Sequence, residues 1–291
     1  MIKKAIILVI IGLFSYNSAF CQKQTKHEVS VWGMGGSSSL KYDLKVGSAS
    51  GGASGGFGVG YTYFVSNMIG LNTGLEFGFY KGTAKLNEIK NSYETTDWEG
   101  KDFLFKSTIS NYEETQNACL LNIPIMLHIQ LPLEKESKFY AAGGIKIGLP
   151  ISGTYKVKKG TIKNTGYYKF EDYEYDRPEE LGFGTFQANE TNEDFDLSTA
   201  IILSLETGIK WKLQEKLGLY TGIYFDYGLN DIGKEDRVNQ FVEYNPASPR
   251  DFYQHSILTS QYITDTKTDS FTNKIIPVAF GVKVRLAFDL N

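Results

Sequence analysis

A period of two in side-chain polarity is the feature that most constrains this chain. Over residues 276–290, small or charged residues alternate with Ile276, Val278, Phe280, Val282, Val284, Leu286, Phe288 and Leu290. Successive side chains of a β-strand point to opposite faces, so this segment is predicted to be a strand with one wholly apolar face.

The same alternation recurs in seven earlier segments, near 28–40, 56–65, 69–80, 121–131, 139–151, 201–213 and 217–230. Their connections alternate in length. Three are tight, at 66–68, 132–137 and 214–216, and four are long, at about 41–52, 85–114, 157–197 and 232–274. All tight turns then lie at one end of the sheet. This layout predicts an all-β fold, an eight-stranded antiparallel transmembrane up-and-down β-barrel with long outer loops.

The two faces of each segment differ in side-chain size. In the second segment, glycine occupies positions 56, 58 and 60, whereas Phe57 and Val59 lie on the opposite face. Because an eight-stranded barrel has a narrow lumen, the glycine-rich face is expected inside and the apolar face outside, in lipid. The alternative is a soluble lipocalin-like barrel, which would place its apolar face inside.

Aromatic residues gather near both ends of the apolar faces, where outer-membrane barrels have interfacial girdles. The predicted girdle residues are Tyr61, Tyr63, Phe139, Trp211 and Phe288 near the tight turns, and Phe77, Phe79, Phe225 and Tyr227 near the long loops.

The first twenty-one residues have the pattern of a secretory signal peptide. Two lysines, Lys3 and Lys4, precede the apolar stretch 5–14, and small residues at 19 and 21 favour cleavage before Gln22. Residues 22–291 would then form the mature barrel, in the bacterial outer membrane. It would keep one cysteine, Cys119, and so no internal disulfide.

Charge excludes one large class of partner. The chain has 30 basic and 33 acidic residues, a formal net charge of −3, so a basic nucleic-acid binder is not expected. The predicted loops 85–114, 157–197 and 232–274 together have a net charge of −9. These acidic, Tyr-rich loops, with Tyr167, Tyr168, Tyr173 and Tyr175, would offer a surface for a partner, a glycan or bridging divalent cations. The alternative is that their charge serves only solubility and repulsion from other cell surfaces.

Four stretches have the character of a known group of barrels: GGFGVGYTYF (55–64), LNIPIM (121–126), FYAAGGIKIGLPISG (139–153) and LYTGIYFDYGLND (219–231). With the eight-segment pattern, they resemble outer-membrane β-barrel proteins of Bacteroidetes, of the broad OmpA/OmpX-like and PorT-like barrel group. The resemblance implies the fold and the outer membrane. Through PorT-like members, it also leaves open an association with secretion.

Charged residues on the inward faces predict a network that fills the lumen, because opposite charges in a narrow polar interior should pair. The predicted network consists of Glu76, Lys146, Glu206, Lys210, Asp226, Lys283 and Arg285. The alternative is an ion pathway lined by the same residues.

Catalytic and ligand-binding motifs are weak. His255 lies beside Ser256 and near Asp251, but such a combination is common in a loop and no catalytic residue is predicted. The Gly-rich tract 47–56 lacks the helix and the Lys-Ser/Thr pair of a phosphate-binding loop. The candidate loop cation site, at Glu190, Glu193, Asp194 and Asp196, lacks EF-hand spacing, so no resident metal or cofactor is predicted.

The functional hypothesis is therefore a non-enzymatic outer-membrane barrel with a charge-plugged lumen and acidic extracellular loops. Its expected partners are outer-membrane lipid and, through the loops, another envelope protein or a surface glycan. One alternative is a narrow channel or secretion-associated barrel, and another is a lipid-modifying enzyme.

Overall fold

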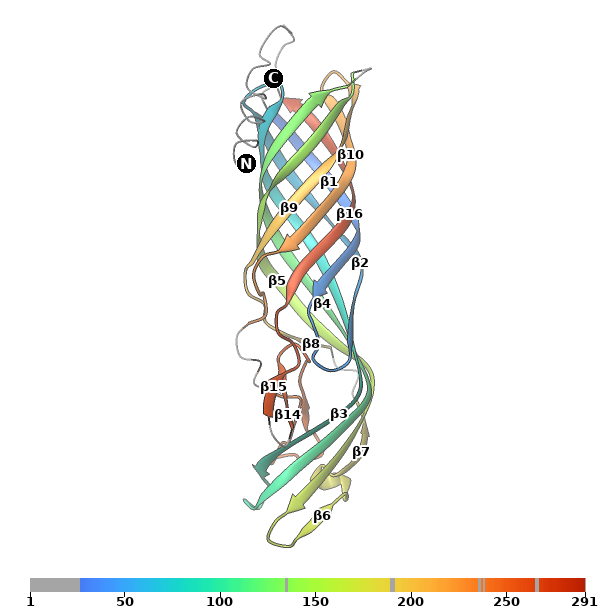
Figure 1. Ribbon diagram of the computed structural model, residues 1–291, viewed down its shortest axis with the longest axis vertical. Helices are drawn as coiled ribbons and strands as arrows, with labels where there is room; N and C mark the ends of the chain where they lie inside the picture. Colours follow the sequence, from blue (N-terminus) through green and yellow to red (C-terminus); the bar gives the residue numbers. More distant parts are fainter. Residues whose placement is uncertain are drawn as a thin grey trace, which may run out of the picture.

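Eight long strands form one closed antiparallel ring, which confirms the predicted barrel (Figure 1). The strands are β1 (His27–Lys41), β2 (Ser48–Phe64), β3 (Ile69–Thr96), β4 (Asp102–Pro132), β5 (Lys138–Tyr168), β9 (Ala200–Gln214), β10 (Leu217–Gly228) and β16 (Ile276–Leu290). Each pairs with the next of these along the chain, and β16 pairs with β1, with Val282 opposite Gly35. The sheet therefore closes on itself.

The computed structural model describes residues 27–133, 136–188, 192–234, 237, 239–264 and 267–290. The predicted signal peptide, 1–21, lies outside this part of the chain. Across the described residues, no helix has the length and apolar character needed to cross a bilayer.

Exposed apolar side chains form a belt around the barrel wall, as the alternation predicts. On β16, Phe280 and Val282 are 57% and 62% exposed, whereas Lys283 and Arg285 are buried. Between Phe280 and Leu290 a strand spans about 34 Å, or about 26 Å of height at a tilt of about 40°. That height matches the apolar band of outer-membrane barrels, about 25 Å. The apolar face of the wall is therefore the face suited to lipid.

The predicted girdle residues lie at the two rims of this belt. Each of them except Phe77 is more than one third exposed. Phe77 is half-buried because it packs against the ring of Phe57, with 5.4 Å between the ring centroids.

Of the segments predicted as loops, 85–114 is largely regular strand and 157–197 is partly so, and the prediction of loops was wrong there. The predicted loop 85–114 contains the end of β3 and the start of β4, and the predicted loop 157–197 contains the end of β5. Apolar residues such as Phe103, Phe105 and Ile109 continue the alternation there, and they are buried. The opposite face is highly polar, and this polarity obscured the alternation in the sequence. Buried apolar residues alternating with exposed polar ones are typical of a sheet that covers a core on one side.

The extended strands and the long connections build a second folded unit, which we call the cap: the described residues of 86–116, 153–199 and 229–275. It adds the short strands β6 (Tyr173–Tyr175), β7 (Gly184–Gln187), β8 (Asn192–Asp194), β11 (Asn239–Gln240), β12 (Val242–Glu243), β13 (Tyr253–Gln254), β14 (Ser260–Thr264) and β15 (Lys267–Ser270), and the 3₁₀-helix η1 (Glu179–Leu181). In Figure 1 the cap continues the barrel downward, with β8 near the junction and β6, β7, β14 and β15 farther from the barrel.

The cap has its own aromatic core. The Phe103 ring lies 5.0 Å from both Tyr168 and Tyr244, and the Phe241 ring lies 5.0 Å from Tyr112, measured between centroids. Tyr168 is only 8% exposed, so it is a core residue and not part of the predicted binding surface. The long connections therefore include a packed structure beyond the membrane belt.

The lipid-facing assignment predicts the effect of a charge in the belt. Val282→Arg should lower the free energy of unfolding by about 2–4 kcal/mol, because it places a guanidinium near the middle of the hydrocarbon. Equilibrium refolding into phospholipid vesicles measures this change. The matched control is Thr96→Arg, an exposed position at the end of β3 beyond the belt, which should leave stability unchanged. Equal effects of both variants would show that the belt does not contact lipid.

Candidate functional site

Six charged side chains from five strands form a chain of alternating sign inside the barrel, in the order Asp226, Lys146, Glu76, Lys283, Glu206 and Arg285. All six are buried, and three acids balance three bases. At the first link, Lys146 Nζ lies 2.8 Å from Asp226 Oδ2 and 2.7 Å from Glu76 Oε1. One lysine of β5 thereby joins β10 to β3.

Lys283 and Arg285 of β16 continue the chain. Lys283 Nζ lies 3.8 Å from Glu76 Oε2 and 2.9 Å from Glu206 Oε2. Arg285 Nη2 lies 2.5 Å from Glu206 Oε1, which also accepts a hydrogen bond from the Tyr140 hydroxyl at 3.0 Å. Each of the three carboxylates in this chain therefore has a cationic neighbour, as charges in a space of low polarity require.

Trp32 of β1 fills the lumen beside this chain. Its Nε1 donates a hydrogen bond to Glu76 Oε2 at 3.0 Å, and Lys283 Nζ lies 4.5 Å from the centroid of its ring. A Cβ atom on Gly58 or Gly60 would come within 2.6 or 2.7 Å of the indole carbons. The glycines of β2 therefore leave the space that the indole occupies.

Aromatic and polar side chains fill the lumen toward the tight turns. The Tyr220 hydroxyl donates to Glu28, 3.0 Å away, and accepts from Gln130 Nε2 at 2.9 Å. Lys210 Nζ lies 2.5 Å from Glu28 Oε2. His128 is fully buried beside Gln130, with 3.1 Å between their Nε2 atoms.

Apolar side chains pack together inside the other end of the barrel. The inward side chains there are buried and belong to the same contact cluster as the core of the cap: Leu40, Tyr80, Leu120, Ala200, Ile202, Tyr224 and Ala279. The lumen therefore has three layers, polar at the turns, ionic in the middle and apolar beneath the cap.

All seven charged residues predicted for the lumen are on its inner wall, but one is not in the chain of six. Lys210 pairs with Glu28, a fully buried residue that the prediction omitted. Glu28 shares its strand face with Ser30 and Trp32, so its position could have been inferred from alternation. Its pairing with Lys210 joins β1 to β9, which alternation within one strand cannot reveal.

Glu114 is a second carboxylate that the prediction missed, because it falls in a segment predicted as a loop. It is fully buried in the cap. Its Oε1 accepts hydrogen bonds from Ser256 Oγ and Gln116 Nε2, at 2.5 and 2.9 Å. Its Oε2 accepts from the Ile257 N–H and the Tyr112 hydroxyl, at 3.1 and 2.8 Å. One carboxylate on β4 therefore holds the connection between β10 and β16.

Burial raises the pKa of the Glu114 carboxyl above its ordinary value of 4.5. The hydrogen bonds from Ser256 and its other donors favour the ionised form but do not cancel the desolvation.

The structure places the described carboxylates of the candidate cation site against different neighbours. Glu193 Oε2 accepts from the Tyr155 hydroxyl at 2.6 Å, and Asp196 pairs with Lys234 Nζ at 2.7 Å. Asp194 is exposed, and Glu190 lies outside the described residues. Within the described ranges, no group of three or more His, Cys, Asp and Glu residues is placed to hold a metal ion.

The residues that suggested a catalytic relay also have separate partners. His255 Nε2 lies 2.9 Å from Glu243 Oε2, and Ser256 donates to the buried Glu114. Asp251 accepts from Ser248 Oγ at 2.7 Å. The geometry therefore joins none of the three to another as a nucleophile and its base would require.

The chain was compared with protein families, solved structures and curated sequences. Residues 20–234 match a family described as outer membrane protein beta-barrel domain. The neisserial surface protein A (NspA) structure is 10% identical with a TM-score of 0.34, and the alignment covers 91% of this chain and 97% of that chain. The translocator domain of the autotransporter NalP from Neisseria meningitidis is 9% identical with a TM-score of 0.26, covering 99% and 95%. No curated protein sequence matches.

The alternating chain predicts a strong effect of removing its first cation. Lys146→Met should lower the free energy of unfolding by about 3–5 kcal/mol, because Asp226 and Glu76 then remain buried with an uncompensated charge. Urea titration in detergent micelles or vesicles measures this loss. The double variant Lys146→Met/Asp226→Asn removes one charge of each sign and should recover much of the loss. No loss in the single variant would contradict the pairing.

The raised pKa of Glu114 predicts how the stability of the cap depends on pH. The folded cap binds this proton more readily than the unfolded chain does, so its contribution to stability is lost as pH rises from about 4.5 through the folded pKa. Glu114→Gln should lower the free energy of unfolding by about 1–3 kcal/mol at low pH, because the amide nitrogen of glutamine is a donor and would face the other donors around it. The variant should also abolish this pH dependence.

Hydrogen exchange at the amides of 256–258 between pH 4 and 8, corrected for intrinsic rates, measures this effect. The control is Glu113→Gln, at a neighbouring carboxylate that pairs with Lys85 and Lys159 instead. An identical pH dependence in Glu114→Gln and the natural chain would contradict the role of Glu114.

Proposed function

Because the chain belongs to the outer membrane protein beta-barrel domain family and lies in the bacterial outer membrane, we propose that it is a non-enzymatic barrel with a plugged lumen. On this proposal, the barrel anchors the cap, and the cap is presented outside the cell to bind a surface partner. The observation that carries the proposal is the neutral chain of six buried charges, with a layer of apolar packing between it and the cap.

The ion-pair chain supports a closed lumen for a simple physical reason. An ion pathway needs groups that can exchange their partner for a passing ion, whereas these charges already neutralise one another at 2.5–3.8 Å. Trp32, Arg285 and Tyr220 occupy the space that remains, with the Arg285 guanidinium carbon 5.6 and 5.2 Å from the two ring centroids. A hydrated ion would have to displace several of these side chains.

The cap supports a binding role because it is a folded structure and not a set of short connections. The tight turns are at the opposite end of the barrel, and barrels of this kind have short periplasmic turns and longer extracellular loops. We therefore place the cap outside the cell. The resemblance to Bacteroidetes barrels, PorT-like members included, agrees with an envelope protein that works through partners.

The absence of enzymatic activity is part of the proposal. It is supported by the separate partners of His255 and Ser256 and by the burial of His128 inside the lumen. Neither arrangement leaves a base beside an accessible nucleophile.

Planar-bilayer recording tests the closed lumen. The purified full-length protein should give no conductance steps in symmetric 1 M salt, because the ionic and apolar layers both exclude water. A porin of known conductance, added afterwards to the same membrane, serves as the control for detection. Stable, voltage-independent steps from the natural chain would contradict the proposal and make the narrow channel the better account.

A further inference from the structure

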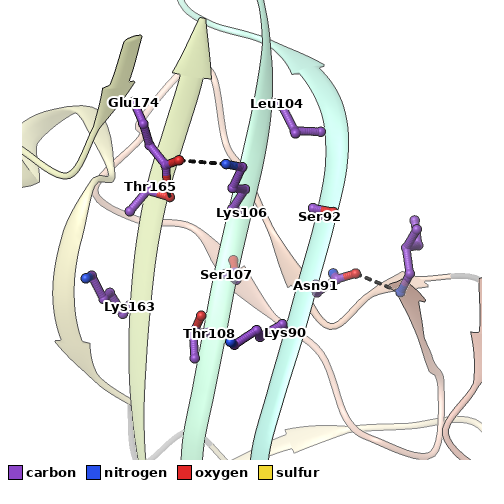
Figure 2. A pocket seen from close by; sticks show the side chains of 11 residues that line it. Lys90, Asn91, Ser92, Leu104, Lys106, Ser107, Thr108, Lys163, Thr165 and Glu174 are labelled. Atoms are coloured by element: carbon purple, nitrogen blue, oxygen red, sulfur yellow. Dashed lines mark hydrogen bonds and ion pairs between the residues drawn. The ribbon is translucent and has the colours of Figure 1, made fainter. Parts of the chain in front are cut away.

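An open trough crosses one face of the sheet that β3, β4 and β5 form in the cap (Figure 2). Its volume is about 490 Å³, within the range of small-molecule sites. Residues 104, 106 and 108 of β4 point into it, whereas the intervening Phe105 is fully buried in the core of the cap and is not part of the lining. The trough is therefore on the outer side of the cap.

The register of the strands places three lysines in two adjacent rows. In one row, Thr108 of β4 lies between Lys90 of β3 and Lys163 of β5. In the next row, Lys106 of β4 lies between Ser92 of β3 and Thr165 of β5. Side chains opposite each other on neighbouring strands are about 5 Å apart at Cβ. Three ammonium groups and three hydroxyl groups therefore face the same space.

The charge of this space is positive. Lys106 Nζ pairs with Glu174 Oε2 at 2.6 Å. Lys90 Nζ lies 3.9 Å from the exposed Glu88, and the Lys163 ammonium has no ion pair or hydrogen bond within the described part of the chain. With one acidic residue in its lining, the trough has a net charge of +2. This patch lies on a cap whose connecting segments are acidic.

The position of the trough argues against a lipid headgroup as its ligand. Phe79, a rim residue of the lipid belt, is eleven residues before Lys90 on the same strand, a separation of about 36 Å along the chain. Even for a tilted strand, that is well beyond the interfacial layer of about 5–8 Å on each side of a bilayer. The ligand must therefore reach the trough from the solvent side.

The remaining lining fits a sugar better than a bare anion. Tyr167 lies in the row next to Lys106, whose Nζ is 5.2 Å from the centroid of the tyrosine ring. The side chain of Leu104 provides an apolar wall beside the hydroxyl groups of the trough, and the tyrosine ring lies opposite Leu104 on β5, just outside the lining. A carboxylate or sulfate on a sugar would receive charge-assisted hydrogen bonds from the lysines.

We propose that this trough binds an acidic saccharide, with Lys90, Lys106 and Lys163 contacting its anionic groups. The inference rests on the proposed function in one respect, the placement of the cap outside the cell, and it names the class of partner that the cap binds.

Calorimetric titration of the purified full-length protein in detergent with an oligogalacturonate tests the inference. Binding should weaken as salt is raised, and the variant Lys90→Gln/Lys106→Gln/Lys163→Gln should bind at least tenfold more weakly. The matched control, Lys158→Gln/Lys159→Gln/Lys234→Gln, removes three lysines of the cap that do not line the trough and should bind as the natural chain does. Heat-modifiable migration in gels verifies that both variants fold.

Three further probes decide the class of ligand: a neutral oligosaccharide of equal length, inorganic phosphate and an acidic peptide. Binding of the acidic saccharide alone supports the inference. Equal binding of the neutral sugar, equal loss in the control variant, or binding of phosphate or peptide but not of the acidic saccharide overturns it. Fluorescent oligogalacturonate on intact cells separates the two proposals. If the purified protein binds it but the cells do not, the trough is supported and the outward placement of the cap fails.

Discussion

Charges buried inside a barrel of eight strands must neutralise one another, because the wall separates them from water and the lumen is too narrow to hydrate them. The chain from Asp226 to Arg285 meets this requirement with three acids and three bases in alternation. The rest of the lumen is arranged around it. Trp32 packs against Glu76 and Lys283, and the glycines of β2 leave room for the indole.

The two faces of each barrel strand contact different surroundings. Val282 meets lipid, and its neighbours Lys283 and Arg285 meet carboxylates in the lumen. Beyond the belt these surroundings change. One face of β3, β4 and β5 there covers the aromatic core of the cap, and the other face contacts water. The chain thus uses one continuous set of strands to build the barrel wall and part of the cap. Glu114 links β4 of the cap to the long connection that returns to β16.

Alternation along the chain predicted the eight strands and the inward side of the seven charges named for the lumen, because both depend on parity within a strand, and the alternating lengths of the connections predicted the barrel. The alternation could not predict which charges pair. Lys146 contacts residues 70 and 80 positions away in the sequence, and these contacts depend on the closure of the sheet. The cap was missed for a different reason. Its strands have lysines, glutamates and threonines on the outer face, and that polarity obscured buried residues such as Phe105 and Ile109.

The accessibility of the lumen lysines to a small reagent tests the central claim most directly. Reductive methylation of the folded protein in micelles, read by mass spectrometry, compares lysines within one molecule. If the lumen is dry and its charges are paired, Lys146 and Lys283, whose side chains are 3% and 7% exposed, should remain unmodified while Lys90 and Lys234, at 78% and 65%, react fully. After unfolding in urea, all four should react. Methylation of Lys146 and Lys283 in the folded protein at the rate of the exposed lysines would contradict the account.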